Sequence, residues 1–136
     1  MRHGRVARMA AIVSLAGLFA AACGEQATLA RLARLEGADV ATSAIVWSEL
    51  MAAAPEKDRR LAENLRLIGE TIDILPFDHA AATAYGQLLH ELEPKRRRVL
   101  DRMVAAQARA LGRSLVTLIA ADFEDIRGLT IEDWSN

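Results

Sequence analysis

Short apolar segments that alternate with longer amphipathic ones constrain the fold of this chain most strongly. Residues 114–119 form a continuous apolar run that is typical of a strand buried on both faces of a sheet. Shorter strand candidates lie at 39–42, 72–75 and 129–131, and helical patterns of about ten residues or more separate them. This order predicts βα units and a mostly parallel sheet covered by helices on both faces.

We therefore expect an α/β fold, specifically a three-layer α/β/α sandwich with about five short strands if an N-terminal strand exists. A chain of 136 residues is long enough to bury one core, so we expect a single domain over residues 1–136. Ligands of such sheets bind at the carboxyl ends of the strands, and polar residues just after strands therefore matter most.

The first 23 residues permit three interpretations: a signal segment, a structural strand and helix, or a diverged or mis-assigned start of the reading frame attached to the body of the protein. The uncharged stretch 9–22 runs directly into Cys23, and three arginines precede it, Arg2, Arg5 and Arg8. This layout is typical of a secretory or lipoprotein signal, and the stretch is short for a transmembrane helix. Alternatively, residues 11–15 form a buried first strand that runs into an alanine-rich helix. We favour the strand, because a sheet without its central strand would expose two unpaired edges.

Three acidic residues lie at or just beyond the ends of expected strands: Glu49, Asp101 and Asp122. A carboxylate cluster is what Mg²⁺ or Mn²⁺ needs, since these hard ions take oxygen ligands and keep several waters. A metal ion held in this way lowers the pKa of a bound water and offsets phosphate charge. The pattern alone leaves other roles open. Asp101 near a helix N-terminus is favoured by the helix dipole, Glu49 can be a solvated helix position and Asp122 a turn residue.

Four segments resemble those of the VapC-type PIN-domain ribonuclease toxins in their order and spacing. They are TSAIVWSEL at 42–50, LPFD at 75–78, DRMVAAQA at 101–108, and the end of the chain from ADF at 121–123 to the closing Asp133-Trp134. The resemblance covers the body 37–134, whereas residues 1–24 diverge. It implies a PIN-like fold and Mg²⁺-dependent hydrolysis of RNA phosphodiester bonds, with Mn²⁺ as a possible substitute.

The resemblance also implies roles for individual residues and partners. Glu49 and Asp101 fall on metal-site carboxylates of the family, and Asp122 falls on a more variable acidic position, so we expect these three to form the catalytic set. The family's partners are an RNA substrate and a cognate antitoxin protein, usually with a homodimeric toxin. We expect a cytoplasmic protein without membrane contact.

The basic run at 95–98, with one further arginine nearby, is a candidate contact for RNA phosphate. Its arginines are Arg96, Arg97, Arg98 and Arg102. The net charge of −1 provides no global basic field, so any nucleic-acid contact must come from such a local patch. A solvated loop and helix start would explain the run equally well.

Two departures from the family pattern predict weakened metal binding. The family's first strand ends in Leu-Asp-Thr-Asn, and its Asp is the principal metal ligand, whereas we place the corresponding positions at Met9, Ala10 and Ala11. Ile119 stands where Asn or Asp is common. Two alternatives follow: a catalytically impaired PIN-fold protein that binds an antitoxin without cutting RNA, and a lipid-anchored envelope protein attached through Cys23.

Overall fold

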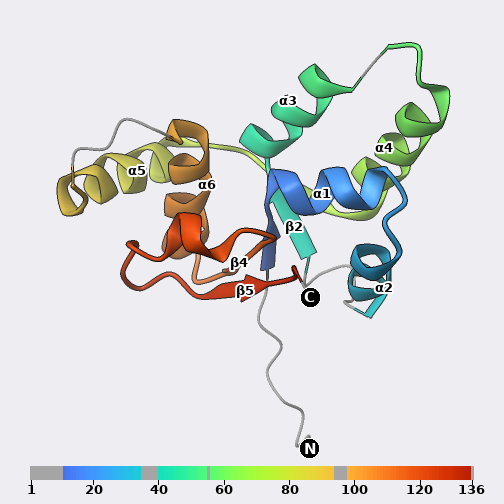
Figure 1. Ribbon diagram of the computed structural model, residues 1–136. Coiled ribbons are helices and arrows are strands. Elements are labelled where there is room, and N and C mark those ends of the chain that lie inside the picture. Colours follow the sequence, from blue (N-terminus) through green and yellow to red (C-terminus); the bar gives the residue numbers. More distant parts are fainter. Residues whose placement is uncertain (1–10, 35–39, 55, 94–97, 136) are drawn as a thin grey trace, which may run out of the picture.

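The computed structural model describes residues 11–34, 40–54, 56–93 and 98–135 (Figure 1). These residues form a five-stranded sheet in which every neighbouring pair is parallel, in the order β3-β2-β1-β4-β5. The strands are β1 (Ala11–Val13), β2 (Val40–Ser43), β3 (Asp73–Leu75), β4 (Ser114–Thr117) and β5 (Ile131–Asp133). The expectation of an α/β fold with about five short, parallel strands is confirmed.

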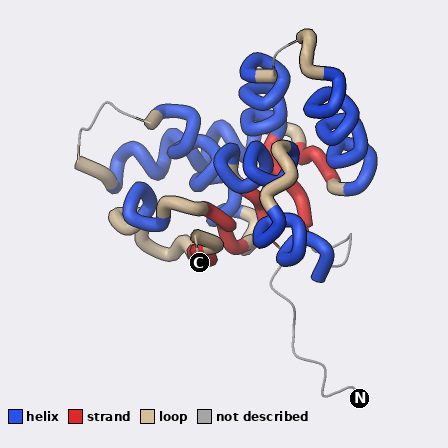
Figure 2. The backbone as a smooth tube through the Cα atoms, turned by 45° about the vertical axis from the view of Figure 1, so that its right-hand side comes forward, coloured by secondary structure: helices blue, strands red, loops and turns tan. Residues whose placement is uncertain are grey.

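Helices connect the strands and cover the sheet. They are α1 (Leu15–Ala22), α2 (Gln26–Arg34), α3 (Ala44–Ala53), α4 (Arg59–Thr71), α5 (His79–Glu91) and α6 (Val99–Ala110), with the 3₁₀ helix η2 (Ala120–Phe123) after β4. The strand order runs from β1 to β3 in one direction and from β1 to β5 in the other. Right-handed crossovers therefore place α1 to α4 on one face and α5 and α6 on the other, which gives the three layers seen in Figures 1 and 2.

The N-terminal segment is the centre of the sheet. In β1, Ile12 and Val13 are fully buried, and the strand pairs with β2 on one side and with β4 on the other. The following α1 buries Leu18 against the sheet and carries Gly17, where a Cβ would lie 2.8 Å from Val13 Cγ1. The interpretation of this segment as a first strand and an alanine-rich helix is confirmed. Cys23 is exposed just after α1.

The side chains of the residues that precede them cap three of the helices. The Ser43 hydroxyl accepts a hydrogen bond from the Ile45 backbone N–H at the start of α3. Asp58 and Asp78 cap α4 and α5 in the same manner. Such caps satisfy backbone N–H groups that have no partner within the helix. Through its cap, Ser43 fixes the orientation of α3 at the carboxyl edge of β2.

Expected strand boundaries are wrong by one or two residues in each strand, and the first strand ends at Val13 instead of residue 15, where α1 has already begun. The strand predicted at 114–119 ends at Thr117, because the Thr117 hydroxyl accepts a hydrogen bond from the Ile119 backbone N–H and the chain turns into η2. The last strand occupies Ile131–Asp133 instead of 129–131, since Leu115 pairs with Ile131 in the register of β4 and β5. These last two shifts bring polar groups closer to the carboxyl edge of the sheet.

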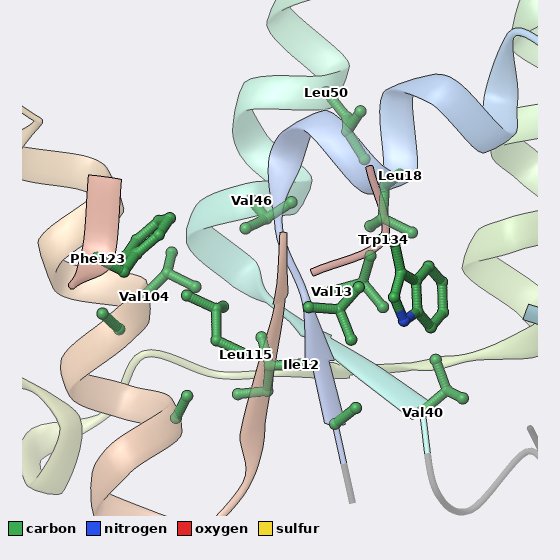
Figure 3. Close-up of a cluster of buried hydrophobic side chains, with 14 of the residues drawn as sticks. Ile12, Val13, Leu18, Val40, Val46, Leu50, Val104, Leu115, Phe123 and Trp134 are labelled. Carbon is green, nitrogen blue, oxygen red and sulfur yellow. The ribbon is translucent and has the colours of Figure 1, made fainter. Parts of the chain in front are cut away.

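The core extends on both faces of β1 and β4. Figure 3 shows Ile12 and Leu115 on the same side of the sheet as Val104 of α6. Val13 points to the opposite side, toward Leu18 and Trp134. This alternation follows from the two-residue period of a strand. Within the described residues, no helix has both the length and the apolar character needed to span a membrane.

Replacing Ile12 with alanine is expected to lower the free energy of unfolding by about 2–5 kcal/mol, because a fully buried side chain in the central strand leaves a cavity. Urea denaturation of the full chain measures this change. Leu67→Ala is the matched control: Leu67 is 47% exposed on α4, and its loss should cost roughly 0.5 kcal/mol. Equal costs for the two variants would contradict the central position of β1.

Candidate active site

A pocket of about 510 Å³ opens at the carboxyl ends of β1 and β4. The strand order reverses at β1, and in parallel sheets such a reversal opens a crevice in which ligands bind. Polar and charged residues of the pocket are Ser14, Thr117, Glu49, Arg98, Asp101 and Asp122, and apolar ones are Phe19, Ala53, Ile119 and Phe123. Three carboxylates and one guanidinium therefore line the pocket together with apolar side chains.

The three predicted carboxylates line this one pocket although they come from three different elements. Glu49 lies in the middle of α3, Asp101 in the first turn of α6 and Asp122 in η2. The structure thus brings together all three acidic side chains that the sequence singled out. Among the described residues, however, no three His, Cys, Asp or Glu side chains are close enough to form a ready-made metal cage.

Arg98 bridges two of these carboxylates. Its Nη1 lies 3.2 Å from Asp101 Oδ2 and 3.2 Å from Asp122 Oδ2, so both oxygens approach the same nitrogen. Arg98 also precedes α6 with a left-handed backbone (φ 60°), which is unfavourable for a residue with a Cβ. The two ion pairs offset this cost by neutralising carboxylates that would otherwise repel each other.

The pKa of Glu49 is raised above its ordinary value, first by burial and second by the negative charge of Asp101. Both causes disfavour the ionised carboxylate. The folded protein therefore binds a proton at Glu49 more tightly than the unfolded chain does. This contribution to stability is complete below the ordinary pKa of a glutamate and is lost as the pH rises through the raised value.

Glu49→Gln is therefore expected to raise the melting temperature of the metal-free protein at about pH 7.5, by about 1–3 °C. The difference should vanish near pH 4, where Glu49 of the wild type is protonated too. Thermal unfolding in EDTA at both pH values measures it. Glu63→Gln is the control, and it should change the melting temperature at about pH 7.5 in the opposite direction, because Arg66 lowers the pKa of Glu63. A lower melting temperature for Glu49→Gln at neutral pH would rule out the like-charge contact with Asp101.

Ser14 is a pocket residue that sequence reasoning missed. It follows β1 directly, and its backbone N–H donates to the Val116 carbonyl at 2.9 Å. The side chain is 8% exposed, and its hydroxyl has no hydrogen-bond partner among the described residues. Buried hydroxyls are normally paired, so an unpaired one that lines an acidic pocket indicates a polar ligand.

Ser14 stands at the carboxyl end of β1, after the positions at which we placed the family's missing motif. We placed that motif at Met9, Ala10 and Ala11, but Ala11 begins β1, and Met9 and Ala10 lie outside the described residues. The residue at the carboxyl end of the strand is Ser14. A serine after an apolar run carries no sequence signal by itself, and only the register of β1 against β4 identifies it.

The donor set of the pocket fits a divalent metal ion in its chemistry. All candidate ligands are oxygen atoms, from the carboxylates of Glu49, Asp101 and Asp122 and the unpaired hydroxyl of Ser14. Hard ions such as Mg²⁺ bind through one or two carboxylates and keep several waters, so a complete protein cage is not required. The raised pKa of Glu49 also indicates an excess of negative charge that a cation would relieve.

The predicted phosphate contacts are only partly covered by the structure. Arg98 lines the pocket, whereas Arg96 and Arg97 lie outside the described residues. The Arg102 guanidinium donates to both carboxylate oxygens of Asp125, at 2.9 and 3.0 Å, and its side chain is only 11% exposed. Arg102 therefore has a structural ion pair, and Arg98 is the better placed arginine for an incoming phosphate.

Comparison with known proteins identifies the family of this chain. Residues 18–127 match the PIN domain. The chain is 40% identical over 98 residues to the tRNA(fMet)-specific endonuclease VapC of Shigella flexneri. The aligned region covers 68% of this chain and 74% of that protein. The chain is 32% identical over 92 residues to the protein of the same name from Salmonella typhimurium, over 66% of this chain and 67% of that protein.

Solved structures agree with this assignment. The VapBC2 complex of Rickettsia felis, bound to a promoter DNA fragment, contains a chain with a TM-score of 0.76 and 22% identity, covering 91% of this chain and 98% of its own. A chain of the DNA-bound VapBC of Salmonella typhimurium has a TM-score of 0.73 and 26% identity, covering 93% and 98%. The first match shows the fold, and the curated relatives show the family. This chain therefore belongs to the PIN-domain family of VapC-type endonucleases.

Proposed function

We propose that this protein is the toxin of a toxin–antitoxin pair, a metal-dependent endoribonuclease that cleaves tRNA, and that residues 1–136 form a single PIN domain. One observation carries the proposal. Glu49, Asp101 and Asp122 line one pocket at the centre of the sheet, beside the unpaired hydroxyl of Ser14. Relatives named for cleavage of tRNA(fMet) support the choice of tRNA as the substrate class.

Glu49 and Asp101 would hold a divalent ion, Mg²⁺ by preference, and Asp122 would contact it directly or through a water molecule. When bound there, such an ion would supply a water of lowered pKa and positive charge for the scissile phosphate. The carboxylates of this chain have two tasks: they draw the cation by their charge, and they orient its water molecules. Ser14 contributes a neutral hydroxyl, which can donate a hydrogen bond to a water molecule or to a phosphate oxygen.

Arginines of the basic run position the RNA. Arg98 lies in the pocket next to Asp101, and Arg96 and Arg97 precede it in the chain. Guanidinium groups suit phosphate because they present several N–H donors in a planar fork. Contacts of this type bind RNA without regard to sequence, so they set affinity and orientation and leave the choice of substrate to other groups.

A cognate antitoxin protein is the proposed partner that keeps the enzyme inactive. Structural neighbours were solved as VapBC complexes, which supports a partner of this kind. Phe19 and Ile119 line the pocket and are 37% and 50% exposed, so they offer apolar contacts to an antitoxin segment. We further propose a homodimeric toxin that acts in the cytoplasm, where tRNA is found.

A cleavage assay tests the proposal. The full chain is incubated with initiator tRNA(fMet), with elongator tRNA(Met) and with an unstructured RNA, each with Mg²⁺ or with EDTA. We expect cleavage of a tRNA with Mg²⁺ and none with EDTA. Cleavage that is equal with and without EDTA would contradict the metal-dependent mechanism, and cleavage of the unstructured RNA alone would contradict tRNA as the substrate.

A second candidate function is antitoxin binding without catalysis. Ser14, instead of a carboxylate, stands at the end of β1, and Ile119 presents an apolar side chain to the pocket. Both features lower the negative charge available to a metal ion. A protein that binds an antitoxin but leaves every RNA intact at saturating Mg²⁺ would have this second function.

A further inference from the structure

We propose that Arg98 is a resident cation of the carboxylate site: it occupies the position between Asp101 and Asp122 in the metal-free protein, and a divalent ion binds by displacing it. Arg98 is in this sense a positioning residue, since it keeps the two carboxylates together until the metal arrives. The inference rests on the proposed function for the identity of the incoming ion.

The geometry of the ion pairs is the first argument. A single nitrogen, Arg98 Nη1, lies 3.2 Å from one oxygen of Asp101 and 3.2 Å from one oxygen of Asp122. Mg²⁺ requires oxygen ligands at about 2.0–2.1 Å and a separate shell of waters. An ion that bridges these two oxygens would take the place of Nη1 between them, so the two cations compete for this position.

The charges around Arg98 are the second argument. Glu49, Asp101 and Asp122 are the acidic side chains that line the pocket, and Arg98 is the cationic one among its described lining residues. Arg98 contacts Asp101 and Asp122, and Glu49 lines the same pocket as a third carboxylate. The guanidinium thus neutralises part of the acidic cluster and leaves an excess that a divalent ion would neutralise further.

The backbone of Arg98 is the third argument. Among the described residues, Arg98 is the one non-glycine residue with a positive φ. Such a conformation is unfavourable for an L-residue and persists only where surrounding contacts hold it. Within the part of the chain that the structure describes, the contacts of Arg98 are the two ion pairs of its side chain and the hydrogen bond that its carbonyl accepts from the Arg102 backbone N–H at 2.9 Å. Displacement from the carboxylates therefore removes the side-chain contacts that help to hold this turn.

The proposal predicts that loss of Arg98 strengthens metal binding. The apparent affinity of a site is reduced by the fraction of molecules in which it is blocked, so a guanidinium that occupies the carboxylates nine-tenths of the time weakens binding about tenfold. Arg98→Ala should therefore bind Mn²⁺ about tenfold more tightly than the wild type. Alanine keeps the Cβ and with it the backbone cost at φ 60°, so the change isolates the guanidinium.

Isothermal titration of the full, metal-free chain with MnCl₂ measures this effect. Arg66→Ala is the matched control, because Arg66 also bridges two carboxylates, Glu63 and Glu70, but on the exposed surface of α4 and outside the pocket. We expect its Mn²⁺ affinity to stay within about twofold of the wild type, because exposed charges outside the site are largely screened by solvent and salt. Circular dichroism confirms that each variant is folded.

A second measurement titrates the wild-type protein with metal and uses a variant only to assign a signal. The ¹⁵Nε–¹Hε signal of Arg98, assigned by its absence from Arg98→Lys, is followed in the wild type during titration with MgCl₂. The proposal predicts that the signal moves toward that of a solvent-exposed arginine at the same metal concentration that saturates the site.

The outcomes separate the inference from the proposed function. Tighter Mn²⁺ binding by Arg98→Ala together with release of the Arg98 signal supports the inference. If the wild type binds metal but Arg98→Ala binds it equally or more weakly, or if the Arg98 signal does not move, the inference is overturned while the metal-dependent function stands. If neither protein binds Mn²⁺, both are overturned.

Discussion

Asp101→Asn is expected to reduce the rate of tRNA cleavage by about 100-fold or more at saturating Mg²⁺, because removal of one preorganised charged group from an active site has an effect of this size. The substitution keeps the shape of the side chain and removes its charge, so it weakens the hold on the metal ion without opening a cavity. Asp101 lies in the first turn of α6 and forms one partly exposed ion pair with Arg98. Its charge should contribute no more than about 1 kcal/mol to stability.

Asp125→Asn is the matched control for this prediction. Asp125 lies outside the pocket and pairs with Arg102 through an ion pair that is half-exposed on the carboxylate side. Both variants lose one negative charge from an arginine–aspartate pair, and only Asp101→Asn loses it from the pocket. Initial rates with the full chain on tRNA measure the difference, and equal rates for the two variants would exclude Asp101 from the metal site.

Ser14→Asp is expected to tighten Mg²⁺ and Mn²⁺ binding by about tenfold and to raise the cleavage rate, since it adds a carboxylate at the end of β1 beside the existing three. In the absence of metal the same change should lower the melting temperature, because a buried carboxylate next to other acids lacks a counter-charge. Tenfold tighter binding adds about 1.4 kcal/mol of metal-dependent stabilisation at a saturating concentration. The variant should therefore be less stable than the wild type in EDTA and regain stability with metal.

Ser14→Asn provides the control for the added charge. Asparagine has nearly the volume of aspartate, so it reproduces any steric cost in the buried position without the negative charge. Melting temperatures of the three proteins in EDTA and in MnCl₂ separate the two effects. If Ser14→Asp and Ser14→Asn show the same metal-dependent shift, the end of β1 is not part of the metal site.

Much of the fold was predictable because local chemistry and tertiary structure agree. Apolar runs located the strands to within a few residues, and the segment 42–50 that carries Glu49 was identified by its resemblance to the family. Asp101 and Asp122 were predicted as site residues from their positions after expected strands or at a helix start, and both line the pocket. For each of these residues, the sequence pattern that predicts its role lies within a few positions of it in the chain.

The remaining features of the site depend on contacts between distant segments. Ser14 becomes a site residue only through its register with β4, about a hundred residues later in the chain. The bridge from Arg98 to Asp122 requires a left-handed turn at a residue that disfavours it. The pairing of Arg102 with Asp125 likewise joins α6 to the segment after η2. Such long-range pairings leave no periodic pattern in a single sequence.

The central position of β1 also determines when the enzyme can become active during its synthesis. A strand at the start of the chain must wait for β4, since Ala11 pairs with Ser114 and Val13 with Val116. On the ribosome, the middle of the sheet is completed only after residue 117 has left the exit tunnel, because β1 pairs with β4. The pocket joins Ser14 to Asp122, so a nascent or truncated chain has no complete site. The pocket can therefore form only after the chain has been synthesised through Asp122.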